Sequence, residues 1–117
     1  MIYWSTRQRG LVEAVLQRHP VESSECANAA QSILPTAREV DDTAHARIIV
    51  SADALYIQPK GPSRRWVYHV TVAVTENHVD VLTGPDGFPQ DTYLETYFHH
   101  PEAHTVRPVE PDEWATL

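Results

Sequence analysis

The first third of the chain alternates between apolar and polar positions with the period of a helix. The apolar positions of the first such stretch recur at the i, i+1, i+4 and i+5 spacing of one helix face: Leu11, Val12, Val15 and Leu16. Thr6 is its candidate N-cap, and Pro20 closes it. A second helix is predicted to begin at Ser23 or Ser24, since both are good N-cap residues, and its apolar stripe stops at Pro35.

From residue 46 the pattern changes to that of strands. The run 47–51 has β-branched residues at its centre, Ile48, Ile49 and Val50, and a second apolar run follows at 55–57. The strongest strand of the chain is predicted from Arg65 or Trp66 to Thr75, where side chains alternate between two faces. A tight turn at 76–77 leads into a returning strand over 78–82.

The rest of the chain is predicted to hold a loop, a short helix and a tail. Residues 83–89 are rich in turn formers and read as a loop, and an amphipathic helix capped near Asp91 runs to Phe98. The polar tail 101–117 is punctuated by proline, with an edge strand around 106–109. The order of elements predicts an α+β domain, with the helices of about 6–34 packed on an antiparallel sheet from the β-rich half, about 46–98.

Composition restricts the class of protein. The 117 residues fit one domain, 1–117. The 16 acidic and 9 basic residues give a net charge of −7, and no basic cluster exceeds Lys60 with Arg64 and Arg65, which argues against nucleic acid as a partner. No apolar run resembles a signal peptide or approaches the roughly 20 residues that span a bilayer. We therefore expect a cytoplasmic protein with no membrane partner, or an effector exported without a classical signal.

Three residues form the candidate chemical site. Cys26, the only cysteine, begins the second predicted helix, where unpaired N–H groups and the positive end of the helix dipole stabilise a thiolate. His69 lies on the strongest predicted strand, which can hold it as a base, and Asp80 lies on the returning strand, where a carboxylate can fix the imidazole tautomer. This order favours a cysteine nucleophile.

These residues and their surroundings resemble a known family. The run HVTVAV at 69–74, the run VDVLTG at 79–84 and the helix after them resemble the strand pair and short helix of papain-fold bacterial toxins and deamidases, and Cys26 completes the likeness over roughly residues 20–98. The resemblance implies a papain-like or transglutaminase-like core. It also implies Cys26 as nucleophile, His69 as base and Asp80 as the residue that orients the base.

The same resemblance implies an activity and partners. Related enzymes hydrolyse peptides, deamidate glutamine or transfer acyl groups through a thioester, so we expect a protein substrate, and a cognate inhibitor or immunity protein if the domain is a toxin. The tetrahedral intermediate needs donors for its oxyanion. The backbone N–H of Cys26 is one candidate, and Gln8 is the candidate for a second.

The third site residue has an alternative. A two-residue turn at 76–77 pairs His69 with Gly84, which leaves Asp80 four residues away along the strand, about 13 Å at ~3.3 Å per residue. A bulge or strong twist must then bring the two together. Asp86, just past the residue opposite His69, is the alternative third residue.

A second class of function stays open at this stage. A lone cysteine beside alanines is also typical of helix packing, and a strand histidine can be a hydrogen-bonded core residue. The chain would then be a non-catalytic, acidic interaction module such as an immunity or adaptor protein. The cluster of His99, His100, Glu102 and His104 has metal-ligand residue types, but Pro101 breaks a helical spacing. We predict no metal site and no cofactor.

Overall fold

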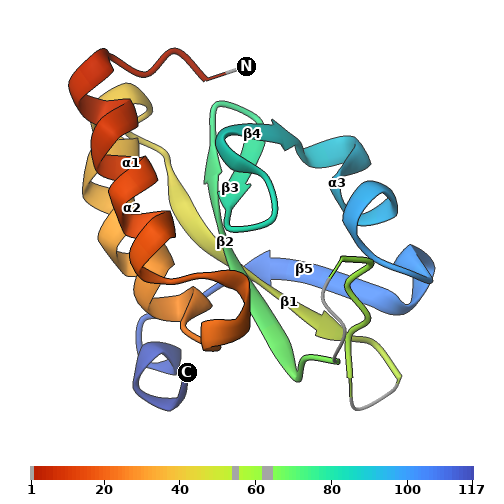
Figure 1. The fold of residues 1–117 in the computed structure, drawn as a ribbon. Helices are drawn as coiled ribbons and strands as arrows, with labels where there is room; N and C mark the ends of the chain where they lie inside the picture. Colours follow the sequence, from red (N-terminus) through yellow and green to blue (C-terminus); the bar gives the residue numbers. More distant parts are fainter. Residues whose placement is uncertain (1, 54–55, 62–64) are drawn as a thin grey trace.

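A five-stranded antiparallel sheet separates two long helices on one face from a short helix on the other (Figure 1). The computed structural model describes residues 2–53, 56–61 and 65–117. The strand order is β4-β3-β2-β1-β5. In chain order the elements are α1 (Thr6–Arg18), η1 (Val21–Ser23), α2 (Cys26–Val40), β1 (His45–Ser51), β2 (Tyr68–Val74), β3 (Asn77–Asp80), β4 (Gly84–Pro89), α3 (Gln90–Tyr97), η2 (Pro101–Ala103), β5 (His104–Pro108) and η3 (Glu113–Thr116). The predicted α+β class is confirmed.

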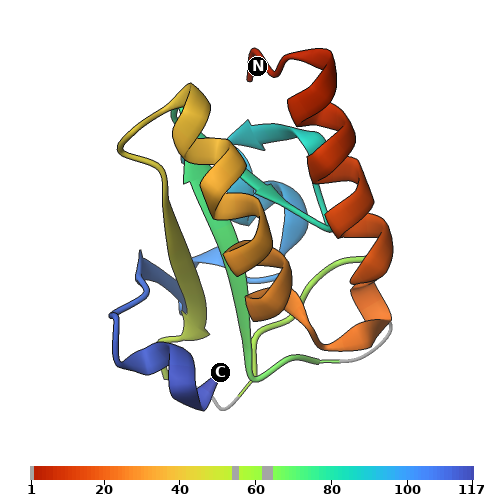
Figure 2. The same ribbon diagram turned by 90° about the vertical axis from the view of Figure 1, so that its left-hand side faces the viewer.

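The main core lies between the sheet and the pair α1 and α2, which Figure 2 shows in front of it. The predicted stripe of the first helix is confirmed at Val12, Val15 and Leu16, whereas Leu11 is 45% exposed. A set of fully buried aliphatic residues joins the second helix to the sheet: Ile33, Ile48, Val70, Val72 and Val74. The sheet and α2 are therefore held together by the largest apolar cluster of the described residues.

A second cluster covers the other face of the sheet, beneath α3. Its fully buried members are Ile49, Ile57, Tyr93 and Phe98. In β2 the predicted alternation is confirmed: Val70 belongs to the main core, whereas His69 pairs with Ile49 of the second cluster. His69 thus lies on a strand that is covered on both faces, which explains why the residue is only 1% exposed.

The second helix is longer than the sequence predicted. Pro35 was expected to end it, but α2 continues to Val40, and Thr36 and Ala37 are buried. A proline inside a helix removes one backbone hydrogen bond and costs about 3 kcal/mol. Burial of the last turns against the sheet outweighs that cost here. Tertiary packing therefore keeps the helix intact although Pro35 disfavours it locally.

The tight turn between β2 and β3 lies at Thr75 and Glu76, one residue earlier than predicted. Both have positive φ, 45° and 67°, which is the backbone of a two-residue type I′ hairpin. Such turns usually carry Asn-Gly or Asp-Gly, and this one has neither. The carboxylate of Asp41, just past the end of α2, instead accepts a 2.8 Å hydrogen bond from the Thr75 N–H. The turn is held by a residue distant in sequence, so its position could not be read locally.

Two further expectations change in the second half of the chain. Residues 84–89, predicted as a loop, form strand β4, which pairs with β3 through a bulge between His78 and Asp80. The edge strand predicted near 106–109 is confirmed as β5, at one edge of the sheet. The run predicted at 55–57 lies partly outside the described residues, and Ile57 forms an isolated bridge with Trp66. Among the described residues, no helix combines the length and apolarity needed to cross a membrane.

Candidate active site

Cys26 is the first residue of α2. The chain reaches it through a left-handed residue, Ser24 (φ 62°), and the N-cap is Glu25 rather than either predicted serine. Ser23 still takes part, because its hydroxyl accepts a 3.3 Å hydrogen bond from the Glu25 N–H. At this position the N–H groups of the first helical turn have no carbonyl four residues earlier to bind, and the helix dipole is positive. The sequence-based placement of Cys26 at a helix N-terminus is confirmed.

The Cys26 thiol contacts His69. Its sulfur shares a hydrogen bond with the His69 side chain, and the backbone N–H groups of Val70 and Ala27 also bond to it. Burial alone would raise the pKa of the thiol, but His69, by hydrogen bond and charge, and these N–H groups lower it below its ordinary value. The environment therefore favours a thiolate.

The backbone of β2 explains why the helix can reach this histidine. β3 pairs with β2 from Val74 to Val72 and stops there, so Val70 has no β3 residue opposite. The start of α2 lies at this open flank, where the Val70 N–H bonds the Cys26 sulfur. The N-terminus of α2 and the open end of the hairpin together assemble the site.

Asp80 is the partner of His69. The observed pairs Ala73 with His78 and Val72 with Val79 put Asp80 across from Thr71, only two residues from His69. Diagonal neighbours on one face of a sheet lie within side-chain reach. The His69 Nε2 and Asp80 Oδ2 atoms are 3.1 Å apart. The separation of about 13 Å expected from a turn at 76–77 was therefore wrong, because the turn lies one residue earlier and no distortion is needed.

The two buried groups stabilise each other's charge. Burial lowers the pKa of His69, but Asp80 and then Cys26 raise it, to about 9 overall. Burial raises the pKa of Asp80, but the hydrogen bond and charge of His69 lower it below its ordinary value. An imidazolium and a carboxylate are thus the favoured forms at neutral pH. Because Nε2 is engaged by Asp80, Nδ1 is the ring nitrogen left for the thiol.

Sequence reasoning missed the residues that hold Asp80. Its Oδ1 accepts hydrogen bonds from the N–H groups of Leu82 (2.8 Å) and Thr83 (3.1 Å), and its Oδ2 accepts one from the Tyr93 hydroxyl. The first two form a side-chain turn that the run Asp80 to Thr83 could have indicated. No local signal pointed to Tyr93, since a buried tyrosine on a short helix looks like an ordinary core residue.

Two candidates from the sequence lie elsewhere. Gln8 closes the capping box of α1 with Ser5, and its Nε2 donates to Glu39 at the far end of α2, 13 residues after Cys26. At 1.5 Å per helical residue that is about 20 Å from Cys26, so the prediction of Gln8 as an oxyanion donor was wrong. Asp86 is exposed and pairs with Arg9 at 2.5 Å. It is not the partner of His69.

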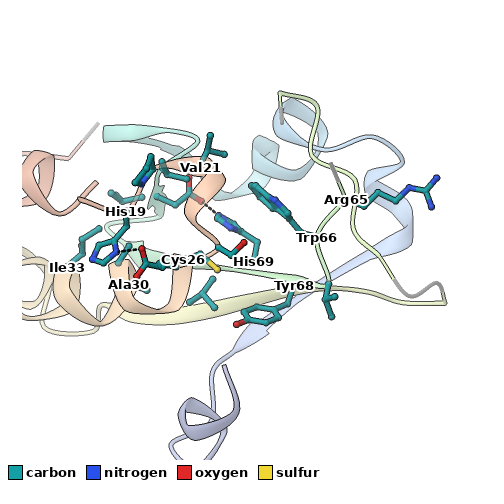
Figure 3. A pocket seen from close by; sticks show the side chains of 18 residues that line it. His19, Val21, Cys26, Ala30, Ile33, Arg65, Trp66, Tyr68 and His69 are labelled. Atoms are coloured by element: carbon teal, nitrogen blue, oxygen red, sulfur yellow. Dashed lines mark hydrogen bonds and ion pairs between the residues drawn. The ribbon is translucent and has the colours of Figure 1, made fainter. Parts of the chain in front are cut away.

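A cavity of about 280 Å³ opens beside Cys26. One wall is α2 with the segment before it, including His19, Ala30 and Ile33, and the opposite wall comes from β2 and β3. Figure 3 shows the Cys26 sulfur directed toward the His69 ring. Trp66 stacks on that ring, with centroids 4.9 Å apart and planes 23° apart, and shields it on the side away from the cysteine. Cys26 thus lines the cavity, whereas the His69 ring is buried.

In the histidine cluster after α3, His104 holds the loop in place through hydrogen bonds to the backbone. His104 donates from Nδ1 to the His100 carbonyl (2.9 Å), and its Nε2 accepts from the Gln58 N–H (3.3 Å). Both ring nitrogens are therefore used in holding the loop to the sheet. Within the described ranges, no group of three or more histidine, cysteine or acidic residues is arranged to hold a metal.

Comparison of the chain with protein-family models, curated proteins and solved structures finds no match.

Proposed function

We propose that this protein is a cysteine-nucleophile hydrolase or deamidase that acts on an amide of a protein substrate through a thioester intermediate. The observation that carries the proposal is the continuous hydrogen-bonded series Cys26, His69 and Asp80, which begins at a helix N-terminus and opens into a cavity. Nucleophile, base and orienting group each touch the next, which is the arrangement that activates a thiol.

The reaction follows from these contacts. The Cys26 thiolate attacks the carbonyl carbon of the amide, and the negative charge moves to the carbonyl oxygen. The first-turn N–H of Cys26 is a donor available to that oxyanion. When the intermediate collapses, the C–N bond breaks and the His69 imidazolium gives its proton to the leaving nitrogen. Water, deprotonated by His69, then attacks the thioester, which releases a carboxylic acid and restores the thiolate–imidazolium pair.

The site supports this activity over the non-catalytic alternative. An interaction module would have no need of a cysteine whose thiol bonds a histidine, and a structural cysteine would be packed among aliphatic side chains with a raised pKa. Cys26 does pack at the edge of the main apolar cluster, but its thiol bonds His69 and its pKa is lowered. The same arrangement of a helix N-terminus and a strand histidine also supports a papain-like relationship. A toxin or effector role rests on that resemblance alone and stays a prediction.

An isotope experiment tests the activity without knowledge of the natural substrate. Denatured casein is incubated with the protein in water enriched in oxygen-18, and the products are analysed by mass spectrometry. Hydrolysis through a thioester places the heavy oxygen in a new carboxyl group, at glutamine side chains for a deamidase or at new C-termini for a protease. We expect incorporation with the wild type and with His45→Ala, which removes an exposed imidazole, and none with Cys26→Ala. Equal incorporation by wild type and Cys26→Ala, or none by either, would contradict the proposal.

A further inference from the structure

Tyr93 and His69 bind the same carboxylate oxygen. The Tyr93 hydroxyl and the His69 Nε2 both contact Oδ2 of Asp80, whereas Oδ1 is occupied by the N–H groups of Leu82 and Thr83. The tyrosine comes from α3, an element that supplies none of the three reacting groups. It is therefore placed to act on the histidine through the carboxylate.

The position of this hydroxyl is fixed by packing. Tyr93 is fully buried, and its ring lies between His78 (centroids 4.6 Å apart), Tyr97 (5.3 Å) and Phe98 (6.0 Å). Rings on several sides leave the tyrosine little freedom to turn away. The hydrogen bond to Asp80 is thus a constant part of the site.

We propose that Tyr93 is a positioning residue which, by donating to Oδ2, limits the negative charge that Asp80 presents to His69 and so keeps the imidazolium a competent acid. The inference rests on the proposed function, in which His69 protonates the leaving nitrogen. A carboxylate that already accepts a strong phenolic hydrogen bond is a weaker acceptor for a second donor on the same oxygen. Without the tyrosine, His69 would be held more tightly as a cation.

The charged neighbours of His69 raise its pKa, so a residue that limits this rise favours proton donation. Cys26 from α2 and Asp80 from β3 raise the pKa of His69, to about 9 despite burial. His78 of β3 has its own pKa lowered to about 4, chiefly by burial, so it is neutral near His69 at neutral pH. Tyr97 faces Asp80 from α3, and its pKa is raised by burial and then by that carboxylate. Among these titratable groups, Tyr93 alone donates directly to the oxygen that binds His69, and the non-titrating side chain of Thr71 also bonds Asp80. Because proton donation is fastest when the acid's pKa lies near the working pH, a further rise would slow the leaving step.

The test is a titration of the His69 ring by NMR in a Cys26→Ala background, which removes the thiol and makes the readout independent of reactivity. Tyr93→Phe keeps the packed ring and removes the hydroxyl, and we expect it to raise the His69 pKa by about one unit. Asp80→Asn should lower the pKa instead. A residue that only supported the fold would loosen the His69–Asp80 bond, so both variants would then move the pKa downward.

The controls separate the two proposals. Tyr97→Phe, from the same helix, removes a hydroxyl that makes no bond to Asp80 within the described part of the chain, and should leave the His69 pKa unchanged. Fluorotyrosine in place of Tyr93 strengthens the donor and should lower that pKa, which keeps the test available if Tyr93→Phe does not fold. An unchanged or lowered pKa in Tyr93→Phe overturns the inference on Tyr93. An ordinary thiol at Cys26 in the wild type would instead overturn the proposed function, while the titration result would stand.

Discussion

Replacing His69 with alanine is expected to slow alkylation of Cys26 by iodoacetamide at pH 6 by about tenfold. An ordinary thiol with a pKa near 8.5 is only roughly 0.3% ionised at that pH. A thiolate of low pKa is less nucleophilic, with a Brønsted coefficient of about 0.4–0.5, which cancels much of the gain in ionised fraction. The wild-type rate should be nearly constant from pH 6 upward until His69 loses its proton near its pKa of about 9.

The pH dependence of the alkylation rate distinguishes loss of the Cys26–His69 ion pair from loss of the fold. In His69→Ala the rate should rise about tenfold per pH unit up to ~8.5, as for an isolated thiol. His69→Gln keeps a donor toward Asp80 and should show the same profile. His45→Ala should behave as the wild type. If both His69 variants reacted at pH 6 at the wild-type rate, His69 would not activate Cys26.

The second large effect concerns stability. Asp80→Ala is expected to lower the free energy of unfolding at pH 6 by about 3 kcal/mol or more, because it leaves buried donors without an acceptor. These donors include the His69 imidazolium, the Tyr93 hydroxyl, two backbone N–H groups and the Thr71 side chain. Asp86→Ala is the matched control: that carboxylate is exposed and pairs with Arg9, so its removal should have a much smaller effect. Urea unfolding of both variants measures the difference.

The pH dependence of this loss has a defined sign. The folded-state pKa of Asp80 lies below its ordinary value, so its contribution to stability is complete above an unfolded-state pKa of about 3.9. The contribution is lost as the pH falls through the folded-state pKa. The difference in the free energy of unfolding between wild type and Asp80→Ala should therefore be largest near pH 6 and should shrink below pH ~4. A gap that stays constant into acid, or an Asp80→Ala variant no less stable than Asp86→Ala, would contradict the assigned role of Asp80.

The sequence predicted those parts of the site that depend on local rules. A cysteine after serines, before an alanine-rich stripe, indicated a helix N-terminus, and the alternation of β2 placed His69 on the strand face opposite Val70. The pairing of His69 with Asp80 depends on the register between β2 and β3, and that register depends on where the turn lies. The turn carries no glycine that would mark its position, because Asp41 from another part of the chain holds Thr75 in place. Asp80 was correctly chosen over Asp86 as the partner of His69, but its distance from His69 was overestimated.

The remaining differences arise from contacts between distant segments. Pro35 is a strong local breaker, yet burial of Thr36 and Ala37 carries α2 past it. Gln8 was chosen for its residue type, whereas its place at the start of α1, antiparallel to α2, puts it at the wrong end. Tyr93 could not be recognised, because its hydroxyl matters only once α3 lies over the end of β3. The length of α2 and the places of Gln8 and Tyr93 depend on packing between distant segments, which a local sequence pattern does not show.

The most direct test of the thiolate–imidazolium pair is a titration of the ultraviolet absorbance of the Cys26 thiolate in the wild type. Because Cys26 is the only cysteine of the chain, Cys26→Ser provides a complete blank. We expect the thiolate absorbance to appear with a midpoint well below ~8.5 and to persist through neutral pH. A single transition at or above ~8.5 would show that Cys26 is an ordinary thiol, and would contradict the proposed enzyme.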